Sequence, residues 1–344
     1  QPQPYGEYDV SVSLAGYEPV LVRGAQVFPH VTAYQNVVLP AGNSDEEELI
    51  SVEPPVLFGT YPEKIPEDEV KPLPESTGFV VLPEPVIPEF IVVHAGTLAN
   101  TSAPNYWIPY KDYIKNVASC EIYATWPEQA IIANVLAIIS FTLNRVYTEW
   151  YRAKGYNFTI TSSTAYDHAF TYGRTIFAEI SAVVDDIFNT YITRPNIRQP
   201  LLTQYCDGRR VSCPNWMTQW GSKDLADQGY DAIDILRRFY GSEVYLTQAD
   251  RVAGVPSSYA GAALREGSRG QAVRTIQQQL NAISDHYPAI KKVPVDGVYG
   301  TQTRTAVETF QRIFKLSSDG IVGKATWYRI SDIFVGVTRA AELR

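Results

Sequence analysis

A short motif that occurs twice near the end of the chain limits what this region can fold into. The pattern Asp-Gly-x-x-Gly-x-x-Thr begins at Asp296 and again, 23 residues later, at Asp319. Glycine permits the positive φ angles that tight turns need, and Asp and Thr side chains accept hydrogen bonds from free backbone N–H groups where a helix begins. Each copy therefore predicts a turn that leads into a helix.

The residues around the repeat add helical patterns. A Leu-x-x-Gly-x-x-Gly segment begins at Leu264, and apolar residues at helical spacing follow it and the first motif copy. The residues of these two patterns are Val273, Ile276, Leu280 and Ile283, then Ala306, Val307, Phe310 and Gln311. Together with the repeat they resemble the three-helix peptidoglycan-binding domain family over residues 264–333.

That resemblance implies binding of wall glycan or stem peptide in a groove beside the Asp-Gly turns. The candidate ligand-binding residues are Asp296, Tyr299, Gln311, Asp319 and Trp327. The alternative is that the glycines, Phe310 and Trp327 only determine the fold.

A carboxylate stands ahead of the most apolar run of the chain, Ala130 to Leu143. Cys120-Glu121-Ile122 is followed by Tyr123 and Trp126, aromatic residues of the kind that can stack on sugar rings. Thr125 and Glu128 form a capping-box pattern and Pro127 suits a first helical turn, so a helix is predicted to begin here. A carboxyl group among aromatic rings is the environment that a glycosidic general acid needs.

This segment, with a second run that begins at Met217 and contains Gln219 and Trp220, resembles the SpoIID/LytB family over residues 110–244. The resemblance implies a lytic transglycosylase in which Glu121 is the acid and base, with Tyr123, Trp126, Gln219 and Trp220 binding substrate. One carboxylate suffices because the sugar's own hydroxyl attacks, whereas hydrolysis uses two.

The chain departs from that family's pattern at one point that matters for catalysis. Cys213-Pro214-Asn215-Trp216 stands where the family has a Gly-His-Gly sequence. Two hypotheses therefore stay open. The protein is a lytic transglycosylase that remodels cell-wall or spore glycan, or it is a non-catalytic structural, surface-coat or polymer-forming protein that uses the same domains for wall anchoring.

Residues 5–39 alternate as β-strands do, with Tyr8, Val10, Val12 and Leu14 on one face. They resemble the second half of a carboxypeptidase-regulatory-like β-sandwich. Because so few strands leave an apolar face uncovered, we expect it to be covered by another copy of the chain, by the segment at Phe79 to Leu82 or by an upstream segment that this sequence does not include.

The predicted fold class is multidomain: a partial N-terminal β-sandwich, a mixed α/β SpoIID-like central domain and a three-helix C-terminal domain. An acidic segment with nine of the 23 prolines is predicted to be an extended linker or strap. The predicted boundaries are 1–42 for the sandwich, 43–89 for the strap, 90–250 for the central domain, 251–263 for a second linker and 264–344 for the C-terminal domain.

The net charge and the hydropathy of the chain limit which classes of partner are expected. The chain has 37 acidic and 29 basic residues and a net charge of -8, which would repel a phosphate backbone, so nucleic acid is not an expected partner. The apolar run 130–143 is shorter than the roughly 20 residues that span a bilayer. We therefore predict a core helix and no membrane span. Peptidoglycan is the expected partner, with self-association through the N-terminal strands.

The three cysteines favour an oxidising compartment. Cys206 and Cys213 flank a short loop that a disulfide could close, which leaves Cys120 unpaired. Zinc is the alternative, but none of the four histidines has ligand spacing to the cysteines, so neither a metal nor a cofactor is predicted. The chain begins at Gln1, which fits a processed or partial chain, and an extracytoplasmic location in the cell wall or on a spore surface is expected.

Overall fold

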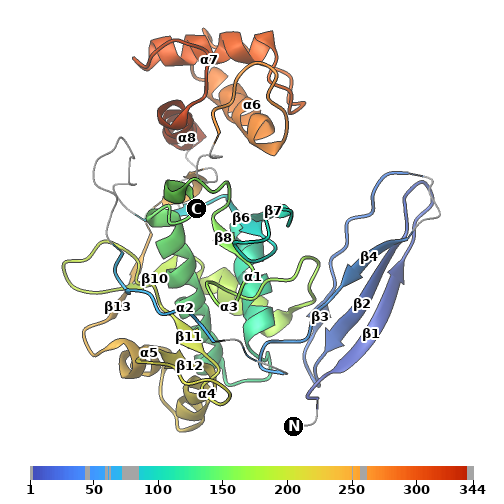
Figure 1. The fold of residues 1–344 in the computed structure, drawn as a ribbon, viewed down its shortest axis with the longest axis vertical. Helices are drawn as coiled ribbons and strands as arrows, with labels where there is room; N and C mark the ends of the chain where they lie inside the picture. Colours follow the sequence, from blue (N-terminus) through green and yellow to red (C-terminus); the bar gives the residue numbers. More distant parts are fainter. Residues whose placement is uncertain are drawn as a thin grey trace.

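The chain folds into several parts with mixed α/β content and small sheets, so the multidomain prediction is confirmed at this level (Figure 1). The computed structural model describes residues 3–42, 47–58, 61, 63–71, 85–249, 251–255 and 262–338.

The N-terminal part is a three-stranded sheet. Strands β1 (Gly6–Val12) and β2 (Val20–Val27) form an antiparallel hairpin, and β4 (Glu48–Ser51) pairs with β2 in parallel. The register shifts between Tyr8 and Val10, which lie opposite Ala25 and Val22, so β2 holds one extra residue. Gly24, at φ 75°, takes the left-handed conformation that this bulge requires.

The predicted apolar face of this sheet is partly wrong. Tyr8 and Leu14 are 59% and 58% exposed. Of the predicted face, Val10 packs against a buried cluster, whereas Leu14 lies beyond the end of β1. The buried cluster instead contains residues of β2, of β4 and of the segment after it, with Val37 and Leu39 packed against them: Val20, Val22, Ala25, Ile50 and Val52. The chain's own segments thus cover this face. Self-association stays a prediction, and Phe79–Leu82 lies outside the described residues.

The N-terminal part is attached to the central domain by paired strands and a shared core. Strand β3 (Ala33–Tyr34) pairs antiparallel with β9 (Ile176–Phe177). The buried Phe28 ring packs against Tyr123 and Phe177, with centroid distances of 5.5 Å and 5.0 Å.

The described residues between Val52 and Lys71 lie against the central domain rather than free in solvent. Leu57, Tyr61 and Lys64 are buried. The Val56 N–H donates to the carbonyl of Cys120 at 2.9 Å, and Lys64 Nζ donates to the carbonyl of Asp167 at 2.8 Å. We call residues 52–71 the strap.

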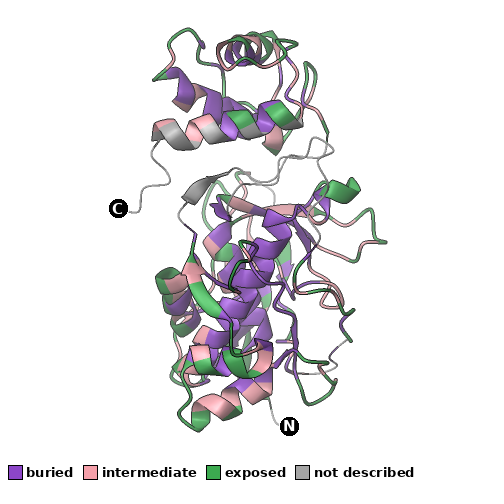
Figure 2. Cartoon of the chain, turned by 90° about the vertical axis from the view of Figure 1, so that its left-hand side faces the viewer, coloured by how far each residue is buried: buried purple, intermediate pink, exposed green. Residues whose placement is uncertain are grey.

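Helix α2 (Glu128–Tyr147) forms the centre of the central domain, and buried residues follow its length (Figure 2). It is long and apolar enough to span a membrane by composition, but its side chains are buried within the protein, as a core helix requires. The helix begins after Pro127, which is the N-cap residue, and no side chain caps it. The capping box predicted at Thr125 is therefore wrong.

The other central elements surround this helix. The three-stranded sheet has the order β7-β6-β8, and three smaller strand pairs are β10 with β13, β11 with β12, and β5 with β14. The bounds of these elements are β5 (Val86–Pro88), β6 (Phe90–His94), β7 (Asn105–Pro109), α1 (Tyr110–Glu121), η1 (Arg152–Lys154), β8 (Ile160–Thr161), α3 (Ala178–Ile187), β10 (Thr190–Thr193), β11 (Tyr205–Cys206), β12 (Met217–Thr218), α4 (Gln219–Asp227), α5 (Ala232–Tyr240), β13 (Tyr245–Gln248) and β14 (Arg251–Val255).

The C-terminal part, which we call the module, has three helices: α6 (Gln271–Ser284), α7 (Thr301–Ile313) and α8 (Lys324–Thr338) (Figure 1). Its core is separate from that of the central domain and includes the buried residues Val273, Leu280, Tyr299, Phe310 and Trp327. A separate core predicts that the module folds on its own.

Removing the Phe28 ring should destabilise the attachment of the N-terminal part. Phe28→Ala leaves a cavity between Tyr5, Tyr123 and Phe177, so we expect the free energy of unfolding to fall by about 3–5 kcal/mol. Urea unfolding followed by tryptophan fluorescence measures this. The exposed Tyr8→Ala is the control, with a change within about 0.5 kcal/mol, and equal effects of the two variants would contradict the shared core.

Candidate functional site

Each Asp-Gly turn of the module is held by one glutamine side chain from the preceding helix. Gln277 Oε1 accepts from Gly297 N at 2.8 Å, and Gln277 Nε2 donates to Asp296 Oδ1 at 2.9 Å. In the second copy Gln311 makes the same two bonds to Gly320 N and Asp319 Oδ1, at 2.9 Å and 2.8 Å. The internal sequence repeat is therefore a repeated hydrogen-bonding unit.

Three of the five predicted ligand-binding residues of the module are core residues in this structure. Tyr299 and Trp327 are 0% exposed and Gln311 is 1% exposed. Tyr299 Oη donates to the carbonyl of Gly320 at 2.9 Å and so joins the two turns. Their visible role is to determine the fold, although Gln311 also lines the cleft beside the second turn, and ligand contact by these residues stays a prediction.

The two aspartates stay at the surface, where a ligand can reach them. Asp319 lies on the wall of a cleft of about 240 Å³ beside the second turn, together with Leu316, Ser317 and Ala325. Asp296 is exposed at the equivalent turn. The groove that the resemblance implied beside the turns is thus present at the second copy.

Both aspartates have lowered pKa values because the charged form accepts hydrogen bonds. The Val298 N–H, then Gln277, lower the pKa of Asp296, and the Ile321 N–H, then Gln311, lower that of Asp319. A carboxylate whose pKa is lowered by folding contributes stability above its unfolded pKa. That contribution is lost as the pH falls through the folded value.

Glu121 lies at the C-terminal end of α1 and is completely buried. Its Oε1 accepts from Ala169 N at 2.8 Å, and its Oε2 accepts from Gln219 Nε2 at 3.0 Å. Gln219 is also completely buried and its amide donates to the Glu121 carbonyl as well, at 3.0 Å. Neither side chain has surface that a glycan can contact in this conformation, and the catalytic role of Glu121 stays a prediction.

The aromatic residues next to Glu121 pack against one another. Tyr123 and Trp126 are each 6% exposed. Trp220 is half-buried, with its ring centroid 6.0 Å from Tyr123 and 5.1 Å from Trp126. The Arg209 guanidinium lies 3.6 Å from the centroid of the Trp220 ring. Tyr123 and Trp126 thus pack inside the protein in this conformation and Arg209 lies over Trp220, and stacking of these rings on sugar stays a prediction.

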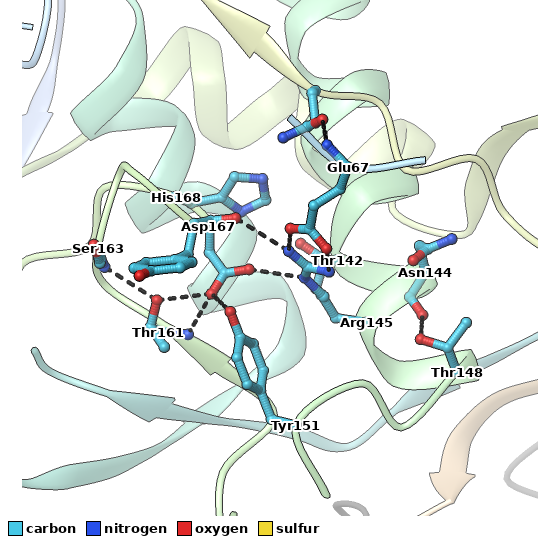
Figure 3. A network of polar contacts seen from close by, with 12 residues as sticks. Glu67, Thr142, Asn144, Arg145, Thr148, Tyr151, Thr161, Ser163, Asp167 and His168 are labelled. Atoms are coloured by element: carbon cyan, nitrogen blue, oxygen red, sulfur yellow. Dashed lines mark hydrogen bonds and ion pairs between the residues drawn. The ribbon is translucent and has the colours of Figure 1, made fainter. Parts of the chain in front are cut away.

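A charged network lies deeper in the central domain, and its central residue is Arg145 of α2 (Figure 3). Arg145 Nε contacts Asp167 Oδ1 at 2.8 Å and Arg145 Nη2 contacts Glu67 Oε1 at 2.6 Å. Asp167 Oδ2 also accepts from Tyr151 Oη and Thr161 Oγ1, at 2.6 Å and 2.7 Å. The carboxylate of Asp167 is thus saturated with donors, as a buried charge must be.

The pKa values in this network agree with paired charges. Burial alone would lower the pKa of Arg145, but Asp167 and Glu67 raise it above its usual value. Burial alone would raise the pKa of Glu67, but Arg145 and Lys71 hold it below its usual value. Both groups are charged at neutral pH.

His168 does not serve Glu121 as a partner. Burial, then Lys64 and Arg145, lower the pKa of His168 well below its usual value, so the ring is neutral. Its Nδ1 lies 3.2 Å from Tyr113 Oη, and the ring stacks on Tyr205. Asp167 pairs with Arg145, so neither residue replaces the histidine that the family pattern has before Met217.

A disulfide joins Cys206 and Cys213, and Cys120 is free and buried. The loop between them is ordered by Asp207, whose Oδ1 accepts from the backbone N–H groups of the next residues. Arg210 of this loop donates to the carbonyl of Leu57 at 2.6 Å. The disulfide-closed loop therefore holds the strap.

No group of His, Cys, Asp and Glu in the described part of the chain is arranged to hold a metal.

Arg145, Glu67 and Lys64 were not predicted from the sequence, although the sequence holds one signal that Arg145 has a buried partner. Arg145 lies two residues after the end of the apolar run 130–143, on the same helix. An arginine on a helix that is buried on every side needs a buried carboxylate. Asp167 and Glu67 supply it from segments far away in the sequence.

The described module is a compact helical domain built around paired Asp-Gly turns, and comparison with known proteins agrees. Residues 269–330 match the family described as "Putative peptidoglycan binding domain". The C-terminal part of the chain therefore contains a peptidoglycan-binding domain, as the sequence predicted.

Individual proteins show the same partial likeness. The chain is 40% identical over 68 residues to a zinc D-Ala-D-Ala carboxypeptidase from Streptomyces albus G, which covers 20% of this chain and 25% of that protein. A peptidoglycan-binding protein from Clostridioides difficile, solved with glutamine hydroxamate, is 32% identical, with 21% and 42% of the two chains covered and a TM-score of 0.19. The SleB N-terminal domain is 25% identical, with 25% and 100% covered and a TM-score of 0.18.

Changing both turn aspartates to asparagine should remove an acid-sensitive part of the module's stability. Asparagine keeps the Oδ1 acceptor that Gln277, Gln311 and the backbone use but does not titrate. We expect the Tm of residues 262–344 to fall from about pH 5 to about pH 2, and to fall less in the double variant Asp296→Asn/Asp319→Asn. Circular dichroism melts measure both slopes, and parallel slopes would contradict the assignment.

Proposed function

We propose that the protein binds bacterial peptidoglycan outside the cytoplasm and that its central domain is non-catalytic in the described conformation. The observation that supports binding is the module: its family match coincides with two complete Asp-Gly turns and a cleft beside Asp319. One relative, 40% identical over 68 residues, is named a zinc D-Ala-D-Ala carboxypeptidase.

We assign residues 110–244 to a SpoIID/LytB-like domain on the motif residues around Glu121 and Gln219. The contact between the two side chains supports this assignment, because it joins the two motifs 98 residues apart. The same contact argues against turnover. Glu121 has both oxygens occupied by N–H donors and no exposed surface, so here it orders the junction of α1, α4 and residue 169.

A lytic transglycosylase is the second candidate, and it needs a different position of the strap. Tyr61 of the strap is buried so near Glu121 that this carboxylate, after burial itself, raises the tyrosine's pKa. Arg210 and the Cys206–Cys213 disulfide hold the strap in place. Catalysis would require these contacts to open. The disulfide suits an oxidising location such as the cell wall or a spore surface.

The module alone should bind peptidoglycan. Residues 262–344, which contain a separate core, are expected to pellet with insoluble peptidoglycan from about 50 to about 200 mM salt, because the proposed groove does not depend on net charge. Gel analysis of pellet and supernatant measures this. Residues 3–255 without the module are the matched control. A module that stays in the supernatant would reject the proposed function.

Glu121→Gln should lower the stability of the fold rather than abolish a reaction. Glutamine can accept at only one oxygen, so either Ala169 N or Gln219 Nε2 loses its acceptor. The expected loss is about 1–3 kcal/mol of unfolding free energy, measured in urea. The exposed Glu63→Gln is the control.

The same two proteins distinguish the non-catalytic proposal from the enzyme hypothesis. On the non-catalytic proposal, the parent chain should release no anhydro-sugar ends from purified peptidoglycan, as measured by mass spectrometry of the soluble products. Release by the parent chain that Glu121→Gln abolishes, with the fold intact, would make Glu121 the acid and overturn the non-catalytic proposal.

A further inference from the structure

A second cleft lies between the N-terminal part and the central domain, away from the module. Its volume is about 730 Å³, within the range of roughly 300–1,000 Å³ that small-molecule and cofactor sites have. One wall comes from residues 34–40, 48 and 50 and the other from residues 108–116 and 170–181. None of the family resemblances found in the sequence assigns a ligand to this cleft.

Direct contacts between its two walls preform the cleft. Strands β3 and β9 pair across it, and Gln35 Nε2 donates to the carbonyl of Gly173 at 2.8 Å. Gly173 has φ 72°, and a side chain there would lie 2.6 Å from Ile50 Cγ2, so the walls approach closely at this point. A ligand would therefore find the two walls already in place.

Two tyrosine rings are presented to solvent on opposite walls. Tyr34 is 48% exposed and Tyr172 is 42% exposed, and both line the cleft. Tyr172 stacks on Tyr106 with a centroid distance of 4.4 Å and an interplanar angle of 16°, which fixes its ring. Exposed aromatic rings that packing holds in place offer apolar contact area at low entropic cost.

The polar groups of the cleft suit hydroxyl groups better than phosphate. Asn36, Glu48 and Asp112 are exposed on its lining and can accept or donate hydrogen bonds. The two cations of the lining are engaged elsewhere: Lys115 Nζ bonds Asp185 Oδ2, and Arg174 bonds Gln26 and the Glu53 carbonyl. A polyanion would meet two carboxylates and no available cation among these groups.

We propose that this cleft is a second glycan-binding site, which takes a β-linked amino-sugar chain against Tyr34 and Tyr172. Sugar rings combine apolar faces, which pack on aromatic rings, with hydroxyl edges, which hydrogen-bond to carboxylates and amides. The amino-sugar identity rests on the proposed function. A chain with two glycan sites gains affinity for a polymer through the higher local concentration of the second site.

Titration of the full chain with soluble glycan tests the site. The probes are N-acetylglucosamine hexamer and glycan strands freed of stem peptides, and isothermal titration calorimetry measures the Kd. We expect Tyr34→Ala/Tyr172→Ala to weaken binding about tenfold, because both ring contacts with the apolar faces of the sugars are lost. Tyr34→Phe/Tyr172→Phe keeps the rings and should bind within about twofold of the parent chain.

The control for surface changes is Tyr8→Ala/Tyr230→Ala, which removes two exposed tyrosines that do not line the cleft. It should leave the Kd unchanged, and equal Tm values for all variants show that the fold is retained. Equal affinity of the parent chain and Tyr34→Ala/Tyr172→Ala overturns the site. So does loss of self-association in that variant without any change in glycan affinity, since the cleft would then bind another copy of the chain.

The pelleting test of the module separates this proposal from the proposed function. If the module pellets with peptidoglycan and the tyrosine variants do not affect soluble glycan binding, the second site fails and the proposed function stands. If the module does not pellet but soluble glycan binding depends on Tyr34 and Tyr172, the cleft stands and the module's assignment fails.

Discussion

The fold of the central domain depends on one buried cation, Arg145. Its guanidinium pairs with Asp167 and with Glu67, so it ties α2 to the segment after β8 and to the strap (Figure 3). Removing one partner of such a group leaves a buried charge without compensation, at a cost of about 3–5 kcal/mol. The strap is therefore a structural requirement of the domain rather than a linker, because the core cannot satisfy Arg145 without Glu67.

The module meets its polar requirements in a different way, with glutamine side chains that bond turns close to them in the sequence. Gln277 and Gln311 each satisfy the turn that follows their helix, so the unit is encoded within about one repeat of the sequence. This locality explains why the sequence predicted the module well. Its helices, turns and apolar core residues follow from patterns a few residues long, and the family match covers the same residues.

The remaining structure was predictable only in part, because its determinants are far apart in the sequence. Glycine at position 24 permits the bulge in β2, but only the pairing of β1 with β2 shows where the extra residue lies. The strap's proline content predicted an extended chain, whereas Tyr61 and Lys64 are buried because the central domain has room and partners for them. Candidate residues such as Tyr299 and Trp327 lie within or next to the Asp-Gly motif copies. A position in such a motif, however, does not distinguish a ligand contact from a core position.

Glu121 illustrates why a catalytic motif and a catalytic site are different observations. The motif places a carboxylate at the end of α1, and the structure uses it to accept N–H groups from Ala169 and Gln219. A carboxylate with two such donors is a strong joint between segments, since a buried charge must keep its partners. The same bonds keep its oxygens from a leaving group. Function has to be argued from the site rather than from the fold, and here an accessible carboxylate lies in the Asp319 cleft of the module, and accessible carboxylates and tyrosine rings lie in the cleft between Tyr34 and Tyr172.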